Sequence, residues 1–579
     1  MTTPLPQAQR VRLRENQLFL VLTIVVGVLA GLSAVLFTVA IDQTSHRLFG
    51  LAPARMRLFL VPPLVSIVTG VLLAKLFPDV RGSGVPQTEA AYRLAGGVIP
   101  THVPVGKFIT GVLCIGSGHS MGREGPSVQI GAGLASLVGR WFQLSPHRVR
   151  DLVPVGAAGA LAAAFNTPIA AVLFALEEII GDLNAALLGS TVVASVAAVI
   201  VERSILGNEP LFHVPTYRLV HPAELLAYAV LGLAGGIVSL LFCKGLLATR
   251  AVVLRLPPRT RIIQPAIGGL IIGGLLLYSP AIMGVGYDYV DQALNGGLVL
   301  KTMAILCFLK LGATIVSYAS GNAGGIFAPS LYIGAMAGGA IGMAVRRVAP
   351  FPTGDAGAYA LVGMGTLFAG IIRAPMTSVF MIFEITQDYQ ILVPLMVANM
   401  LSFAISKRYQ PVPVYHALLL QDHVHLPSPA TQAASAPVTA RHMMDTDAVF
   451  IPPEVSIEEA WERRRDDEAA AYLVGSGNRL AGLVTRERLA ESMVAGRGSQ
   501  PVSSLLDSSL IHVHPDHPID VVLERFAQSP DILPVVNRTE ARRLEGVITF
   551  DSIMNFVHQR TRGVRAESWD NESPAARRQ

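Results

Sequence analysis

The chain has 579 residues, 51% of them hydrophobic and 15% charged, and a formal net charge of +5. It is too apolar for a water-soluble protein of this length and too long for a single domain. Its arginines are spread over short loops and the tail without a basic face interleaved with aromatic side chains, so we expect no nucleic-acid partner.

The first apolar run, residues 18–40, follows Arg10, Arg12 and Arg14. It is longer than the hydrophobic region of a secretory signal and ends without a convincing cleavage site, so we expect a retained membrane span that starts in the cytoplasm. Further apolar runs continue to about Leu420. The sequence therefore predicts an integral membrane region up to that point.

The membrane region contains an internal repeat. Residues 155–179 (VGAAGALAAAFNTPIAAVLFALEEI) align with residues 362–386 (VGMGTLFAGIIRAPMTSVFMIFEIT), so that Glu177 meets Glu384. Segments such as Pro168 to Ile180 are too short to cross a bilayer core of about 30 Å at about 1.5 Å per residue. Short, broken helices at matching places in two repeats indicate an ion site near the middle of the membrane.

Three glycine-rich loops have a composition that suits an anion. They are Gly82-Ser-Gly-Val-Pro86, Gly122-Arg-Glu-Gly-Pro126 and Gly324-Gly-Ile-Phe-Ala-Pro329. Each ends in a proline that predicts the start of a helix, where free N–H groups and partial positive charge attract anions. Glu124 in the second loop lies between apolar flanks, and an ionisable group at membrane depth marks a functional site by default.

These loops, in this order on a duplicated membrane frame, resemble those of the CLC family of chloride channels and chloride/proton exchangers over about residues 18–420. The resemblance implies a homodimer with one pore in each subunit and chloride as substrate. It assigns the central chloride to the Ser83 hydroxyl, the Tyr415 phenol and the backbone N–H groups of Ile326 and Phe327. Two other readings stay open: Phe327 as an ordinary core residue and Tyr415 as an aromatic anchor at the membrane interface.

By the same resemblance, Glu124 becomes the external gating glutamate, which competes with chloride when ionised and leaves when protonated. Gly84, Gly125 and Arg123 are the remaining chloride-binding candidates. Arg123 either raises the local anion concentration or stabilises its loop by binding carbonyl groups, and Lys107 has the same two readings.

Proton coupling requires a second titratable group, and the Glu177-Glu178 pair supplies one. In the family pattern the second residue of this pair is the internal proton glutamate in many exchangers and is usually apolar in channels. Glu178 therefore favours chloride/proton antiport over the alternative, a passive, glutamate-gated chloride channel. Glu177 is expected to be structural. A solvated Glu178 at a helix end stays open as the other interpretation.

The region beyond the membrane part resembles the tandem CBS domains found behind some members. Ala471–Val474 and Gly482–Thr485 read as short buried strands, and the scheme recurs further along the chain. Such units commonly hold a ribose with a Thr/Ser-x-x-Asp pattern, but here Thr485 is followed at the third place by Arg488 and Thr549 by Ser552. An adenosine nucleotide therefore stays open beside a dimerising or regulatory scaffold, and we expect no other cofactor.

The expected fold is an all-α polytopic membrane domain of two inverted repeats with many tilted and broken helices, followed by an α/β cytoplasmic CBS pair. We place the N-terminal segment at 1–16, the membrane domain at 17–425 with repeats of about 17–205 and 220–425, the linker at 426–438, the CBS domains at 439–498 and 501–560, and a disordered tail at 561–579. We expect the protein to lie in a lipid bilayer, and its compact loops favour the cytoplasmic membrane of a bacterium as its location.

We expect a transporter and not an enzyme. Three cysteines at wide spacing, Cys114, Cys243 and Cys307, give neither a disulfide framework nor a metal site. A membrane-anchored nucleotide sensor would not need a duplicated bundle with broken helices. A magnesium carrier would need clustered carboxylates and carbonyls, which the loops lack.

Overall fold

The structure, a computed structural model, describes residues 7–558 apart from 51–52, 183–186, 208–210, 213, 215–219, 427–437, 465–468, 507–509, 530, 541 and 557. Side chains are described from residue 17, that of residue 520 excepted. Most of the expected linker, all of the expected tail and the first six residues thus lie outside the described residues. The chain forms two compact units, residues 1–426 and 427–579.

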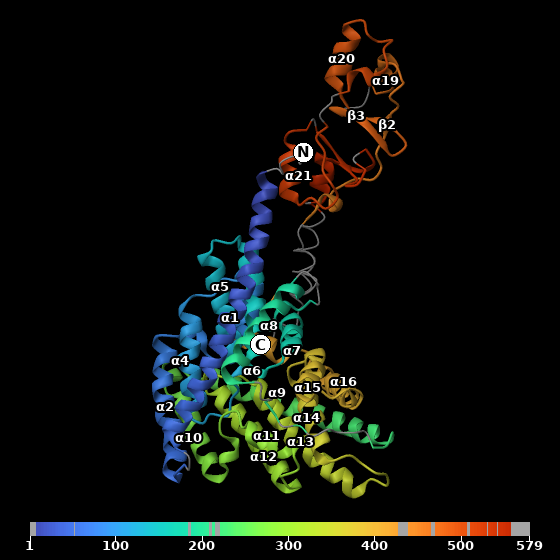
Figure 1. Ribbon diagram of the computed structural model, residues 1–579. Helices are drawn as coiled ribbons and strands as arrows, with labels where there is room; N and C mark the ends of the chain where they lie inside the picture. The colour runs from blue at the N-terminus through green and yellow to red at the C-terminus, as the bar shows by residue number, and fades with distance from the viewer. Residues whose placement is uncertain are drawn as a thin grey trace, which may run out of the picture. The chain divides into compact units, whose positions relative to one another are not determined.

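The first unit is helical (Figure 1). Its helices are α1 Gln7–Phe49, α2 Arg55–Lys75, α3 Val85–Arg93, α4 His102–Gly116, α5 Glu124–Trp141, α6 Pro146–Phe165, α7 Pro168–Phe174, α8 Leu188–Leu206, α9 Glu224–Leu254, α10 Gln264–Tyr278, α11 Tyr287–Leu294, α12 Leu300–Ala319, α13 Phe327–Val348, α14 Ala356–Ile371, α15 Pro375–Thr386, α16 Leu392–Tyr409 and α17 Val414–Gln421. Within the described residues, seven helices are long and apolar enough to cross a membrane. The unit is therefore an integral membrane domain, as the composition predicted.

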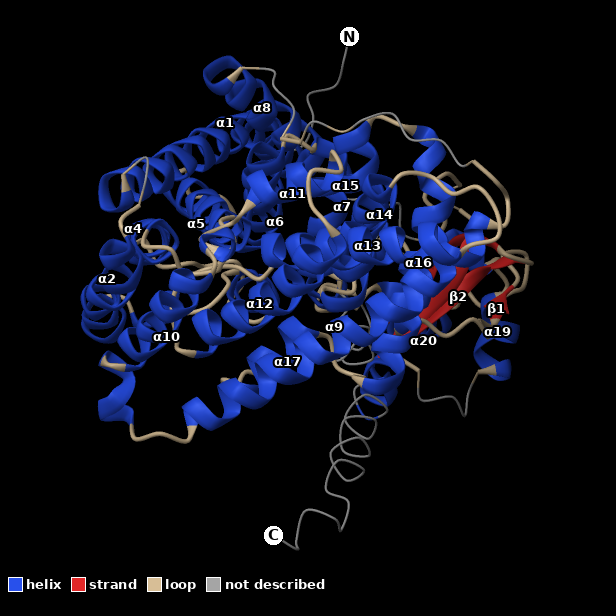
Figure 2. Ribbon diagram, turned by 90° about the horizontal axis from the view of Figure 1, so that it is seen from below, coloured by secondary structure: helices blue, strands red, loops and turns tan. Residues whose placement is uncertain are grey.

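The packing of the helices follows the repeat. The helices α1 to α8 correspond in order to α9 to α16, and equivalent neighbours pack alike: α1 on α8 as α9 on α16, and α5 on α6 as α13 on α14. Two helices pack on their own counterparts, α2 on α10 and α7 on α15. Figures 1 and 2 both show α2 beside α10. Pairs of this kind lie on the pseudo-two-fold axis that relates the two repeats.

Two glutamates join the repeats at the pair α7 and α15. Glu384 accepts backbone N–H bonds from Ile169 (2.9 Å) and Ala170 (2.7 Å) at the start of α7. Glu177 accepts equivalent bonds from Met376 (3.1 Å) and Thr377 (2.8 Å) at the start of α15. Each carboxylate satisfies N–H groups that a helix start leaves free, so the contacts support the structural role expected for Glu177.

Two buried lysines occupy equivalent places in the repeats. Lys107 Nζ donates to the carbonyls of Val80 (2.8 Å) and Gly82 (2.7 Å), at the start of the first glycine-rich loop. Lys310 Nζ donates to the carbonyls of Ile282 (3.1 Å) and Gly284 (2.7 Å). Of the two readings of Lys107, these contacts favour the one in which it stabilises the loop by binding carbonyls.

The breaks in the helices lie where the sequence predicted them. The segment from Pro168 is interrupted: α7 has 7 residues and continues as a π-helical turn, η2, over Ala175–Ile180. The helix α3 has 9 residues, a length of about 14 Å at 1.5 Å per residue, less than half of a bilayer core. The three cysteines are buried and free.

The second unit contains two small sheets. Its strands and helices are β1 Phe450–Ile451, α19 Ile457–Arg463, β2 Ala471–Ser476, β3 Arg479–Thr485, α20 Arg486–Val494, α21 Ile519–Phe526, β4 Ile532–Val536 and β5 Leu544–Thr549. The strand β2 pairs with β1 in parallel and with β3 antiparallel, and β4 pairs with β5 antiparallel. The strands expected from the short apolar runs are thus present as two hairpins.

Candidate functional site

The three glycine-rich loops meet at one place in the membrane unit. Gly122 and Gly325 exchange backbone hydrogen bonds of 2.8 Å in both directions. Gly82 donates to the carbonyl of Asn322 and accepts from the N–H of Gly324, each at 3.1 Å. Because α3, α5 and α13 begin within these loops, their N-termini converge on the same region.

Glycine is required where the loops touch. Gly84 has a φ of 105°, and a Cβ there would lie 2.6 Å from the carbonyl oxygen of Gly125. A Cβ on Gly125 would lie 2.5 Å from the Ser83 hydroxyl oxygen. The Gly84 N–H donates to Gln87 Oε1 at 2.9 Å, so this N–H is already paired. Gly84 serves by its backbone conformation and by the space that a side chain would fill.

The hydroxyls of Ser83 and Tyr415 are buried without a hydrogen-bond partner among the described residues. Both side chains are fully buried, with 0% exposure. The two hydroxyls are close enough to interact with each other, although neither makes a regular hydrogen bond. An unsatisfied buried hydroxyl costs free energy, and two together indicate a place that a further ligand completes.

Ile326 and Phe327 stand at the N-terminus of α13, as its N-cap and first residue. No described residue accepts a hydrogen bond from their backbone N–H groups. The Phe327 ring packs against Phe165, Phe174 and Phe368 with centroid distances of 5.0, 5.6 and 4.4 Å. The two readings of Phe327 are therefore compatible, because its side chain belongs to the core while its N–H remains free.

Glu124 is the first residue of α5 and is fully buried. Its Oε1 accepts a hydrogen bond of 2.6 Å from the Tyr287 hydroxyl, whereas its Oε2 has no partner among the described residues. The Arg123 guanidinium lies over the Tyr287 ring, 5.6 Å from the centroid, and interacts electrostatically with Glu124. Glu124 is thus held beside the free N-terminus of α13, where the N–H of Ala328 also faces it.

Glu178 lies on the π-helical turn η2, a type of helix defect that occurs often at functional sites. Its carboxylate interacts electrostatically with Glu89, Arg93 and Arg373. Tyr415 is also within electrostatic range of Glu178. The candidate proton group and the candidate anion site are therefore close to each other and not at separate ends of the unit.

Sequence reasoning missed Tyr287, Glu89 and His416. His416 follows Tyr415 directly and makes a 2.7 Å contact with Glu89 through Nε2, while its side chain keeps 38% exposure. The repeat offers a signal for Tyr287. It follows Gly284-Val-Gly286 and begins α11, just as Val85 follows Gly82-Ser-Gly84 and begins α3. Glu89 and His416 carry no comparable signal, because only the fold brings α3 and α17 together.

Helix N-termini and unsatisfied hydroxyls converge on a buried point with a carboxylate beside it, an arrangement that suits an anion site between broken helices. Residues 65–407 match the family described as voltage gated chloride channel, and residues 440–495 and 502–559 match the CBS domain. The chain therefore belongs to the CLC family of voltage-gated chloride channels and carries two CBS domains, as the sequence predicted.

Three similar proteins illustrate the match. The H(+)/Cl(-) exchange transporter ClcA of Vibrio campbellii is 30% identical over 68% of this chain and 87% of its own length. The putative chloride channel protein ClcB-like of Ralstonia nicotianae is 34% identical over 58% of this chain and 80% of its own. The crystal structure of a slow cyanobacterial Cl-/H+ antiporter superimposes with a TM-score of 0.64 at 28% identity and covers 70% of this chain and 97% of the other.

Proposed function

We propose that this protein exchanges chloride for protons across a membrane, through one pore in each subunit. The observation that carries the proposal is the pair of unsatisfied hydroxyls, Ser83 Oγ and Tyr415 OH, beside the free N–H groups of Ile326 and Phe327. Four neutral donors offset the dehydration cost of chloride without a full positive charge that would trap it.

Glu124 is the proposed gate. Its ionised carboxylate competes with chloride for the N–H groups at the start of α13, because both carry one negative charge. Protonation removes that charge and releases the position to chloride. One side chain thereby couples the two ions, and the hydrogen bond from the Tyr287 hydroxyl holds it in the observed position.

Glu178 is the proposed internal proton group. Its interactions with Glu89 and Arg93 on α3, and its closeness to Tyr415, support a proton route that approaches the chloride site from the side opposite Glu124. A carboxylate retained among other charged side chains in a membrane unit is unusual unless it moves or binds ions.

A passive, glutamate-gated chloride channel is the second candidate, and the relative described as a putative chloride channel protein favours it. The two candidates share the anion site and differ in the use of Glu178, since a channel does not need an internal proton group. Exchange is therefore the better account of the charged cluster around that residue.

Purified full-length protein in liposomes tests the proposal. An inward chloride gradient drives proton pumping, which a pH electrode records while a chloride electrode follows the flux. We expect Glu178→Ala to keep chloride flux and lose proton pumping, and Glu124→Ala to lose coupling altogether. Asp355→Asn, a change at an exposed carboxylate paired with Arg346, serves as the control and keeps both. Unchanged pumping in either glutamate variant defeats the assigned roles.

The setting is also a proposal: a homodimer in a bacterial cytoplasmic membrane, with the CBS pair in the cytoplasm. The two threonines that could hold a ribose, Thr485 and Thr549, already accept backbone hydrogen bonds, which agrees with a regulatory or dimerising role for the CBS pair. Thr485 Oγ1 accepts from the N–H of Arg488 at 3.3 Å and Thr549 Oγ1 from that of Ser552 at 3.2 Å. Thr485 thereby caps α20, and Thr549 caps the helical residues 550–556 that follow β5. Equilibrium dialysis with labelled ATP and AMP tests nucleotide binding, and light scattering in detergent tests the dimer.

A further inference from the structure

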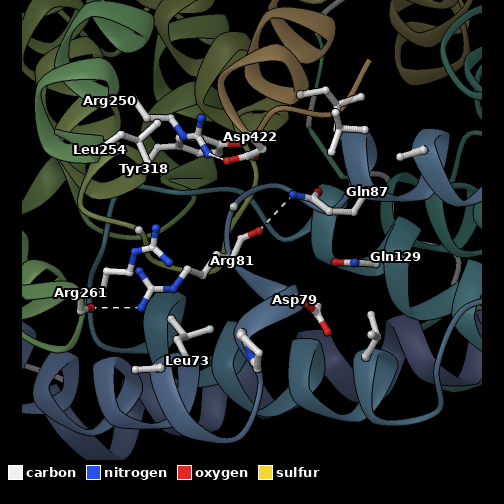
Figure 3. A pocket seen from close by; sticks show the side chains of 18 of the residues that line it. Leu73, Asp79, Arg81, Gln87, Gln129, Arg250, Leu254, Arg261, Tyr318 and Asp422 are labelled. Atoms are coloured by element: carbon white, nitrogen blue, oxygen red, sulfur yellow. Dashed lines mark hydrogen bonds and ion pairs between the residues drawn. The ribbon is translucent and has the colours of Figure 1, made fainter. Parts of the chain in front are cut away.

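A cavity of about 930 Å³ lies in the membrane unit beside the first glycine-rich loop. Figure 3 shows it from close by, with Arg81, Arg250, Arg261 and Tyr318 among its lining residues. It is bordered by the ends of α2 and α9, the start of α10, the helix α3 and the segment after α17. Its volume is far larger than one chloride ion needs.

The cavity has more cations than carboxylates to pair with them. Arg250 is neutralised by Asp422 at 2.5 Å, but Arg81, Arg259 and Arg261 make no ion pair among the described residues. Like-charge repulsion acts between Arg81 and Arg261. An anion in the cavity would relieve this repulsion, since guanidinium groups bind oxyanions through pairs of parallel N–H bonds.

Local geometry holds Arg81 in place. Its Nη2 donates to the carbonyl oxygen of Arg261 at 3.0 Å, a bond drawn in Figure 3. Gly321 leaves room for the guanidinium, because a Cβ there would lie 2.9 Å from Arg81 Nη1. The remaining N–H groups of this fixed guanidinium are available to a ligand.

The wall beside the cations is apolar and open. Leu94, Val98, Leu254 and Leu256 line the cavity and expose between 42% and 49% of their surface. In a membrane unit such side chains face hydrocarbon or the interface, and a cation cluster next to them matches an amphiphile with an anionic head. Free phosphate would use the arginines and leave this wall uncovered.

We propose that this cavity binds a phosphate-bearing anion, namely the headgroup of an anionic phospholipid whose acyl chain lies along the Leu94 and Leu254 wall. This lipid belongs to the leaflet on the side where α1 begins. The chain crosses the membrane in α1 and crosses back in α2, and the end of α2 lines the cavity. The arginines before the first span indicate that this side is the cytoplasmic one.

The cavity also contacts the proposed chloride site. Gly82 and Tyr318 line it, and the Ser83 N–H donates to the Tyr318 hydroxyl at 3.4 Å. Gln87 links the carbonyl of Arg81 to the N–H of Gly84. Occupancy of the cavity therefore stabilises the loop that carries the Ser83 hydroxyl.

Native mass spectrometry of the full chain, released from nanodiscs of mixed phosphatidylglycerol and phosphatidylcholine, tests the proposal without relying on transport. We expect wild-type protein to retain phosphatidylglycerol, and the double variant Arg81→Gln with Arg261→Gln to retain about tenfold less, a factor that corresponds to about 1.4 kcal/mol. Arg255→Gln, next to the cavity in sequence but not lining it, is the control and retains as much as wild type.

A second arm separates the two sources of phosphate. If inorganic phosphate displaces the lipid from wild type and raises its melting temperature but not that of the double variant, free phosphate is a ligand of the same site. Equal lipid retention by wild type and double variant, with no effect of phosphate on either, overturns the proposal. Arg261→Gln alone, at an exposed side chain, decides the outcome if the double variant does not fold.

Discussion

Removing the Tyr287 hydroxyl tests how the proposed gate is held. Tyr287→Phe keeps the ring, its edge-to-face contact with Phe212 at 5.1 Å and its place under the Arg123 guanidinium. It deletes one interaction, the 2.6 Å bond to Glu124 Oε1. Because Glu124 Oε2 already lacks a partner among the described residues, the variant leaves a buried carboxylate with little to replace the loss.

The expected size follows from the charge of the acceptor. A hydrogen bond to a charged group contributes about 1.5–3 kcal/mol, and every 1.4 kcal/mol is tenfold in an equilibrium. The carboxylate in its observed position is thus destabilised by a factor of roughly ten to a hundred. Since chloride competes for that position, the chloride concentration that gives half-maximal flux should fall by about tenfold.

The assay is chloride flux from liposomes at a series of chloride concentrations, at a fixed pH at which wild type is coupled. Tyr289→Phe, on the same helix and without a hydrogen bond to Glu124, is the matched control and should follow wild type. If flux depends on chloride concentration in Tyr287→Phe as it does in wild type, the idea that this hydroxyl stabilises Glu124 in its observed position is refuted. A rise in the half-maximal concentration would refute it equally.

Three further predictions use other parts of the molecule. Ser83→Ala removes a donor from the chloride site, so chloride affinity measured by calorimetry should weaken by roughly tenfold or more, and undiminished affinity would exclude Ser83 as a ligand. Lys107→Met leaves the Val80 carbonyl unpaired and removes one of the two donors to the Gly82 carbonyl, so the melting temperature should drop, as it should for the equivalent Lys310→Met; an unchanged melting temperature would contradict the stabilising role. In the CBS unit, burial and then Arg525 lower the pKa of His517, so the unfolded state binds more protons. Its contribution to stability is present above the ordinary pKa of about 6.5 and is lost as pH falls below it. The melting temperature of that unit should decrease from pH 7 to pH 5, and it should decrease less in His517→Asn. Equal slopes of melting temperature against pH in the two proteins would show that His517 is not responsible.

Much of the frame was predictable because it depends on local patterns. Glycine and proline mark the helix starts at Glu124 and Phe327, and the alignment of Glu177 with Glu384 revealed the repeat before any contact was known. Composition alone identified the membrane domain. Helix starts, repeats and apolar runs are patterns within short segments, so they can be recognised in a single sequence.

The rest depends on contacts between distant segments. The bond from Tyr287 to Glu124 joins residues 163 apart, and the contact of His416 with Glu89 joins residues 327 apart. Gly84 is a chloride-binding candidate by sequence, but in the structure its N–H already donates to Gln87, three residues on. Whether a polar group is free or already paired is decided by geometry that sequence spacing does not contain.

The most direct test of the central claim is a bromide soak of crystals of the full chain, with diffraction measured at the bromine edge. A bromide ion replaces chloride and gives an anomalous signal. An anomalous peak between Ser83 Oγ and Tyr415 OH, within reach of the Ile326 and Phe327 N–H groups, is the predicted result. A map with ordered side chains there and no peak would contradict the anion site on which the proposed transport depends.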